Sequence, residues 1–173
     1  ARVLGDEKEG VVMVLPPGRG QVIFHLKDVE IVSQLIEGSF PDYQHIIPKS
    51  FTTRTVVGTQ GFLKACKAAD IFARENAHTA RMKITPGDVS APGTLELTAQ
   101  SAETGSNEAK VDATIDGTGV EIAFNVKYLL DALNVINTQN VAVETSTSAA
   151  PGVVRPVGRD DFLYVVMPMR LGK

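Results

Sequence analysis

Short stretches in which apolar and polar residues alternate dominate the chain, and they predict strands because alternate side chains of a strand point to opposite faces. Between residues 21 and 26, for example, Val22, Phe24 and Leu26 fall on one face. An uninterrupted apolar run of strand length predicts a strand at residues 11–15. Further stretches predict strands at about residues 29–35, 52–57, 80–85, 93–99, 109–115, 120–126, 141–144, 152–156 and 163–167.

Two segments have the apolar spacing of an amphipathic helix instead. The first runs from about residue 60 to 74, with the apolar stripe Phe62, Leu63, Cys66, Ala69, Ile71 and Phe72. The second begins at Val126 and runs to about Ile136. After residue 51 the order strand, helix, three strands therefore occurs twice. This order predicts an α+β fold in which two copies of one unit, each of about 60 residues, share a core.

The first part of the chain has a different organisation. Three predicted strands precede an extended segment that contains Pro41 and Pro48, which is typical of a linker between domains. These strands look like the last three of another such unit. The chain begins with Ala1 rather than Met, within what the pattern predicts to be the end of a helix at residues 1–5. We therefore expect the natural N-terminus to lie upstream.

Composition and charge exclude several classes of protein. The net charge of −3 and the pI near 5.6 argue against a simple basic nucleic-acid-binding domain, although a basic strip can lie on an acidic protein. The single cysteine, Cys66, excludes an intramolecular disulfide framework and fits a reducing cytoplasm. No apolar run reaches the roughly 18 residues that a membrane-spanning helix requires, and no signal peptide is visible.

The residues that carry catalysis or bind metals are not arranged as such sites require. The histidines His25, His45 and His78 are not paired at ligand spacing with each other or with Cys66. Adjacent acids such as Asp160 and Asp161 point to opposite faces when they lie in a strand, and a solvated turn is the alternative. The sequence thus predicts no catalytic residues, no metal and no cofactor.

Two surfaces are candidates for binding. Lys64 and Lys67 are three residues apart on the first helix, and Lys127 opens the second, which suggests a face that lies against phosphates. An ordinary solvent-exposed face is the alternative. The second candidate is the apolar C-terminal segment from Tyr164 to Leu171. Because Pro168 cannot donate to a ladder, residues 169–171 should leave the sheet, either to cover a core edge or to line a groove for apolar peptides.

Three motifs resemble bacterial DNA sliding clamps, the beta subunits of DNA polymerase III. Residues 35–43 with 46–49 resemble the linker between the second and third domains of that family. Residues 124–133 resemble the start of its last helix, and residues 164–171 resemble its terminal segment almost letter for letter. The motifs occur in the family's order and cover essentially the whole chain. The resemblance implies that residues 1–49 are the end of the second domain with the linker, and that residues 50–173 are a complete third domain.

The family's fold implies helices on one face of antiparallel sheets. Its members are head-to-tail dimers whose ring encloses duplex DNA without sequence preference, and they tether polymerases without catalysing a reaction. The resemblance therefore implies DNA-facing roles for Lys64, Lys67 and Lys127, and a subunit interface at Ile71 and Phe72, for which a place in the core is the alternative. It also implies a bacterial cytoplasmic protein that acts at the nucleoid and takes no cofactor.

The family binds short linear motifs of its partners in a groove between its second and third domains. These partners include the replicative polymerase, the clamp loader and repair polymerases. Carried over by motif, the groove here comprises Pro41, His45, Ile46, Asn125, Tyr128, Val165, Val166, Met167, Pro168, Met169, Arg170 and Leu171. Two departures are His45, where the family often has arginine, and Ala77, where a bulkier aromatic residue sometimes occurs. A stand-alone peptide-binding module without a DNA role is the alternative function.

Overall fold

The computed structural model describes residues 10–40, 42–103 and 105–170. The chain divides into two compact units, Ala1–Asp42 and Tyr43–Lys173. The helix end predicted at residues 1–5 lies outside the described residues.

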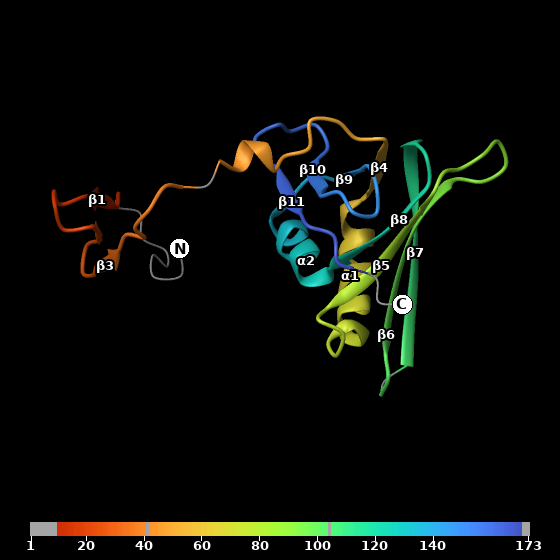
Figure 1. Cartoon of the computed structure of the whole chain (residues 1–173), viewed down its shortest axis with the longest axis horizontal. Coiled ribbons are helices and arrows are strands. Elements are labelled where there is room, and N and C mark those ends of the chain that lie inside the picture. Colours follow the sequence, from red (N-terminus) through yellow and green to blue (C-terminus); the bar gives the residue numbers. More distant parts are fainter. Residues whose placement is uncertain (1–9, 41, 104, 171–173) are drawn as a thin grey trace. The chain divides into compact units, whose positions relative to one another are not determined.

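The first unit contains a three-stranded antiparallel sheet in the order β1-β2-β3 (Figure 1). Its strands, β1 (Val12–Val14), β2 (Gln21–His25) and β3 (Glu30–Gln34), lie where the alternation predicts them. Gly18 and Gly20, with φ of 74° and 56°, turn the chain between β1 and β2. Apolar side chains remain exposed on this small sheet, among them Met13 at 60%.

The second unit begins with a short 3-10 helix, Tyr43–His45, within the segment that the sequence predicts to be extended. The turn is closed by the backbone N–H of Ile46, which donates to the carbonyl of Tyr43 at 3.0 Å.

The strand–helix–three-strand order occurs twice in the rest of this unit, as the sequence predicts. The first copy consists of β4 (Thr53–Gly58), α1 (Thr59–Ala73), β5 (Thr79–Thr85), β6 (Gly93–Ser101) and β7 (Gly105–Gly117). The second copy consists of β8 (Val120–Asn125), α2 (Val126–Val135), β9 (Asn140–Thr145), β10 (Gly152–Pro156) and β11 (Tyr164–Val166).

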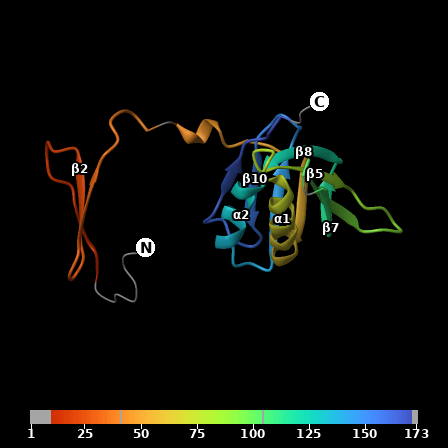
Figure 2. The same cartoon turned by 90° about the horizontal axis from the view of Figure 1, so that it is seen from below.

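The two copies interlock in one antiparallel sheet with the strand order β11-β10-β9-β4-β7-β6-β5-β8. Strand β4 of the first copy pairs with β9 of the second, and β5 of the first pairs with β8 of the second. Both helices lie on the same side of this sheet (Figure 2). The core that they share with the sheet contains large side chains that are fully buried, including Phe62, Leu95, Leu97, Phe124, Leu129 and Leu133.

The two helices run antiparallel to each other, and hydrogen bonds mark both ends of the pair. At one end the N–H of Val126, the first residue of α2, donates to the carbonyl of His78, just beyond the end of α1 (2.8 Å). At the other end Thr59, the first residue of α1, donates through Oγ1 to the carbonyl of Thr138, just beyond α2 (2.7 Å). The start of each helix therefore lies beside the end of the other.

Two details of the sequence interpretation are wrong. The strands expected at about residues 93–99 and 109–115 extend further, into the end of a long hairpin in which Ser101 pairs directly with Gly105. Backbone hydrogen bonding continues there although polar side chains interrupt the alternation. Ile71 does not belong to the buried stripe of α1, because its side chain is 55% exposed. The buried face instead includes Ala65 and Ala73, whose small side chains carry little periodic signal.

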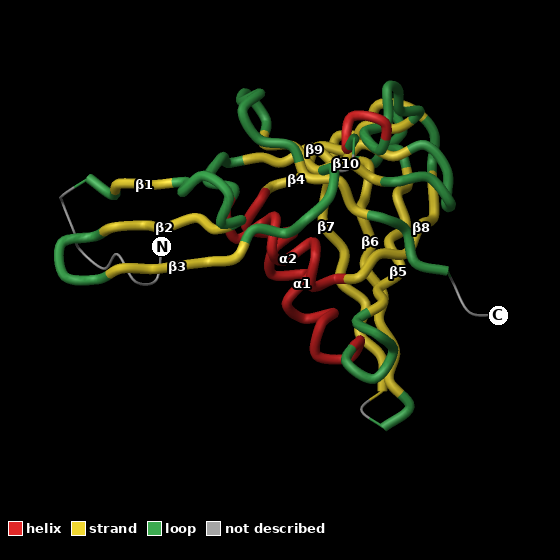
Figure 3. The backbone as a smooth tube through the Cα atoms, turned by 60° about the vertical axis from the view of Figure 1, so that its left-hand side comes forward, coloured by secondary structure: helices red, strands yellow, loops and turns green. Residues whose placement is uncertain are grey.

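The C-terminal segment connects the two edges of the sheet. Strand β11 pairs with β10 at one edge, and the chain then crosses to β8 at the other edge (Figure 3). There Pro168 bridges Phe124, and the N–H of Met169 donates to the carbonyl of Ala123 at 2.8 Å. The tail thus leaves β11 as predicted, and Met169, which belongs to no strand, covers the edge of β8. Pro168 does end the pairing with β10, but the edge strand β8 offers free carbonyl groups to the next residue.

Candidate functional site

The exposed face of α1 carries positive charge along its length. The exposed positions that recur every three or four residues are Gln60, Lys64, Lys67, Ile71 and Arg74, whereas the intervening apolar residues pack on the sheet. The nearest acid on the helix, Asp70, accepts a hydrogen bond from His78 at 2.7 Å and is only 19% exposed. The exposed stripe is therefore cationic, and it is called the helix face below.

The helix face includes a residue that sequence reasoning missed, Arg74. The spacing of Arg74 in the sequence could have revealed it. Arg74 lies seven residues after Lys67, which is two helical turns further along the same side of the helix. The structure brings Lys64 and Lys67 together but separates them from Lys127. That residue lies in the first turn of α2, which the antiparallel arrangement places beside the end of α1.

The two residues predicted for a subunit interface have different environments. Ile71 lies on the helix face and is 55% exposed. Phe72 is partly buried and packs against the core. Of the pair, Ile71 is the side chain available to another molecule.

The tail residues predicted for a peptide groove also differ in exposure. Val166 is 2% exposed and belongs to the core, so its side chain supports the tail from beneath. Met167 is 59% exposed. Val165, Pro168 and Met169 are half-buried, and Arg170 is exposed. Leu171 and, in the linker, Pro41 lie outside the described residues. His45 and Ile46 are both exposed at the start of the second unit.

The junction of β8 with α2 lies next to this tail. The antiparallel bridge between Phe124 and Pro168 places Met167 opposite Asn125. The Asn125 side chain caps α2 by accepting from the N–H of Lys127 at 3.0 Å, and it donates to the carbonyl of Ala77 at 3.0 Å. A fixed polar side chain thus stands beside an exposed methionine.

Aromatic residues border the same region. Tyr128, in the first turn of α2, is 53% exposed. Partial burial raises the pKa of Tyr164 on β11, and the neighbouring Asp131 carboxylate and Tyr128 raise it further. Tyr164 therefore stays a neutral hydrogen-bond donor near neutral pH. Exposed or partly exposed side chains of Met167, Tyr128 and Tyr164 thus lie around the start of α2.

The described residues contain neither a cluster of three or more His, Cys, Asp and Glu side chains arranged to hold a metal ion, nor a helix long and apolar enough to cross a membrane. Cys66 is fully buried in α1, and its burial raises the pKa of its thiol well above the usual range.

The comparisons with known proteins agree on one family. Residues 44–170 match the family model described as the DNA polymerase III beta subunit, C-terminal domain. A beta sliding clamp of Pseudomonas putida is 33% identical over 171 residues, which are 99% of this chain and 44% of the relative. A beta sliding clamp of Staphylococcus aureus is 29% identical over 170 residues, 98% of this chain and 43% of the relative.

Solved structures give the same result. The DNA polymerase III subunit beta of Pseudomonas aeruginosa superposes with a TM-score of 0.84 at 32% identity, over 98% of this chain and 45% of that one. The beta subunit of Thermotoga maritima superposes with a TM-score of 0.80 at 27% identity, over 99% of this chain and 45% of that one. The chain thus spans less than half the length of its relatives. The fold, the sequence match over residues 44–170 and these relatives agree. The chain therefore belongs to the DNA polymerase III beta subunit family.

Proposed function

We propose that the chain is the C-terminal part of a bacterial sliding clamp, a non-catalytic processivity factor that encircles duplex DNA. In this proposal residues 1–49 complete the second domain and include the linker, and residues 50–173 form the third domain. The clamp works in the cytoplasm, at the nucleoid. It tethers the replicative polymerase, the clamp loader and repair polymerases, and the gain for a tethered polymerase is a high effective concentration at its template.

The observation that carries the proposal is the cationic helix face on a chain of this family. A clamp that slides must attract the DNA backbone without reading bases, which requires positive charges that are spread out. Lys64, Lys67 and Arg74 follow one side of α1, and Lys127 adds a charge at the end of the helix pair. The overall charge of −3 does not oppose this function, because Asp70, the one acid of α1, does not lie on the helix face.

The second part of the proposal is the peptide-binding groove at the tail. Met167 and Met169 offer adaptable apolar contacts, and Asn125, Tyr128 and Arg170 offer polar ones. Val165, Val166 and Pro168 hold the tail in place, and His45, Ile46, Pro41 and Leu171 complete the set by family resemblance. Ile71, with Phe72 behind it, is proposed to contact the partner subunit of the ring.

Charge reversal on the helix face tests the DNA role. In the full-length protein that carries this chain, Lys64→Glu with Lys67→Glu should reduce polymerase processivity on a primed circular template. The loss should grow between about 50 and 200 mM salt, where phosphate contacts weaken steeply. Binding of a labelled partner peptide to the same variant serves as the control and should not change. Unchanged processivity together with intact peptide binding would favour the stand-alone peptide-binding module.

Fluorescence anisotropy of a peptide with apolar anchors, of the Gln-Leu-x-Leu-Phe type, tests the groove. The full-length protein should bind it saturably, and Met169→Ala should weaken binding by roughly three- to thirtyfold, as expected for the loss of an interface side chain. Val157→Ala, a partly buried aliphatic side chain outside the groove, is the matched control. Equal affinity of both variants would contradict the placement of the groove at the tail.

A further inference from the structure

The outer face of the sheet, opposite the helices, contains a hollow of about 530 Å³, and of its lining only Arg170 belongs to the proposed groove. It lies over β5, β6 and β8, and the C-terminal tail closes one side of it with Arg170. Its lining residues are Asn76, Thr79, Arg81, Lys83, Glu96, Thr98, Ala99, Gln100, Glu121 and Arg170.

The charges in this outer hollow do not cancel. Glu121 is paired with Arg81, whose Nη1 lies 2.9 Å from its carboxylate. Glu96 is paired with Lys110, which lies on β7 outside the hollow (3.4 Å). Both carboxylates are thus occupied.

Two cations of the outer hollow remain without an ion pair among the described residues, Lys83 and Arg170. On the same face Glu108 and Asp112 of β7 lie opposite Thr98 and Thr94 in the strand register, but they do not line the hollow. The outer hollow therefore presents net positive charge within a chain that is acidic overall.

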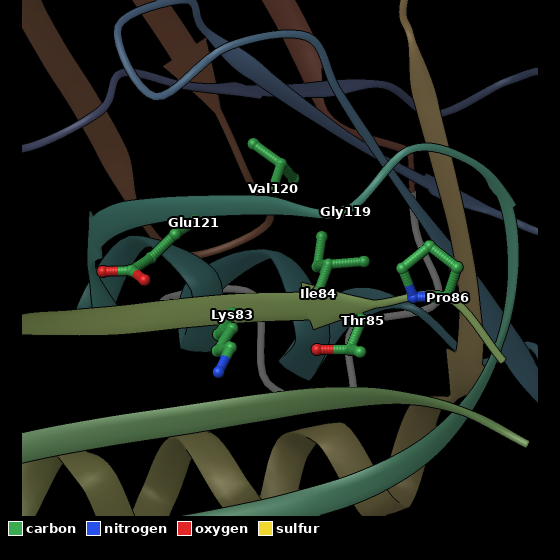
Figure 4. Close-up of a pocket in the computed structure, with 7 residues that line it drawn as sticks. All are labelled: Lys83, Ile84, Thr85, Pro86, Gly119, Val120 and Glu121. Carbon is green, nitrogen blue, oxygen red and sulfur yellow. The ribbon is translucent and has the colours of Figure 1, made fainter. Parts of the chain in front are cut away.

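A smaller hollow of about 310 Å³ adjoins it along β5 and β8, because Lys83 and Glu121 line both. In Figure 4 the side chains of Lys83 and Thr85 lie on one side of β5, and that of Ile84 lies on the other. Pro86 and Val120 give this smaller hollow an apolar end. The outer hollow itself is bordered by hydroxyl and amide side chains, among them Thr98 and Gln100, that can bond to a peptide backbone.

We propose that the outer hollow binds acidic residues that flank the apolar anchors of a partner peptide. The inference rests on the proposed groove and names a second feature of its ligands. Arg170 directly follows Met169, so a peptide that contacts the tail methionines reaches this cation within one residue. Lys83 then lies further along β5. The occupant is a peptide rather than nucleic acid, because the hollow and the helix face lie on opposite sides of the sheet and DNA is assigned to the helices.

Three labelled peptides with identical apolar anchors test this on the full-length protein. One has Gln and Asn flanks, one has three acidic residues before the anchors, and one has them after. At about 50 mM salt we expect one acidic peptide to bind about three- to tenfold more tightly than the neutral one, as a few exposed charge pairs allow. Raising the salt should remove this advantage, and Lys83→Glu should abolish it while leaving the neutral peptide's affinity unchanged. Arg19→Glu changes the net charge equally in the other unit and should preserve the advantage.

The outcomes separate the inference from the function beneath it. If the neutral peptide binds but neither acidic flank helps, or if Arg19→Glu removes the advantage as fully as Lys83→Glu does, the outer hollow is not an acidic subsite. If no peptide binds, the groove itself is wrong, and the inference fails with it.

Discussion

At the scale of single residues, Gly117 shows how the backbone limits substitution. Its φ is 110°, and a Cβ atom there would lie 2.0 Å from the carbonyl oxygen of Thr52. Gly158 also has a positive φ, of 82°, but has open space around it. We predict that Gly117→Ala lowers the free energy of unfolding by roughly 2–5 kcal/mol, because strain and overlap add. Gly158→Ala should cost only about 1 kcal/mol. Urea unfolding followed by circular dichroism measures both, and equal losses would contradict this account.

Cys66 makes a residue-scale prediction about pH. Burial raises the pKa of its thiol above the ordinary value of about 9, so the folded protein keeps the proton that the unfolded chain releases. The stabilising effect is complete below about pH 9 and is lost as the pH rises beyond that value. We expect the unfolding free energy to fall by at most about 1.4 kcal/mol per pH unit above this point through Cys66 alone. Cys66→Ala should reduce that slope, and identical slopes would contradict the prediction.

At the scale of elements, the start of α2 depends on a turn that comes from the other half of the fold. Ala77 and His78 have left-handed φ values of 48° and 55°. The carbonyl of Ala77 accepts from Asn125, and that of His78 accepts from Val126. The turn after α1 therefore positions the first residues of α2.

We predict that Asn125→Ala costs about 1–2 kcal/mol of stability, because it removes both the helix cap and the bond to Ala77. Asn125→Asp keeps an acceptor for the N–H of Lys127 and places a negative charge at the helix start, so its cost should be less than half as large. Thermal and urea unfolding check the order of the two variants. Equal losses for the two variants would show that the bond to Ala77, which both remove, is the dominant contact and that the cap is not.

At the scale of the whole second unit, the C-terminal segment links the two edges of the sheet. Ala123 and Phe124 of β8 are 1% and 0% exposed, although β8 is an edge strand, and residues 168–169 pair with them. A chain that ends at Met167 should lose about 1–3 kcal/mol of unfolding free energy, because it exposes this edge and loses the bond from Met169. A chain that ends at Arg170 is the matched control and should keep full stability. Equal urea midpoints for the two would show that the edge contact contributes nothing.

Much of the fold followed from local pattern. The strands, both helices and the repeated order were predictable because each element buries one face, and burial imposes a period of two or about 3.6 residues. The errors occurred where that rule is weak. Where Ser101 pairs with Gly105, no buried side chains impose a period, and backbone pairing with a hydrogen bond from Ser101 Oγ to Glu75 holds the hairpin. Ile71 is apolar without being buried, and a count of apolar residues cannot distinguish such a residue from core.

For the candidate site, the sequence by itself determined which residues are chemically suited to bind phosphates or apolar peptides, namely the lysines of the helices and the methionines of the tail. The sequence also indicated the family. The arrangement of these residues was decided only by the tertiary structure. Strand pairing over long sequence separations sets the antiparallel order of the helices, which separates Lys127 from Lys64 and Lys67. The same pairing carries the tail to β8 and places Arg170 in the lining of the hollow that Lys83 also lines. No local pattern encodes these contacts, because they depend on which edges of the sheet remain free once both halves have assembled.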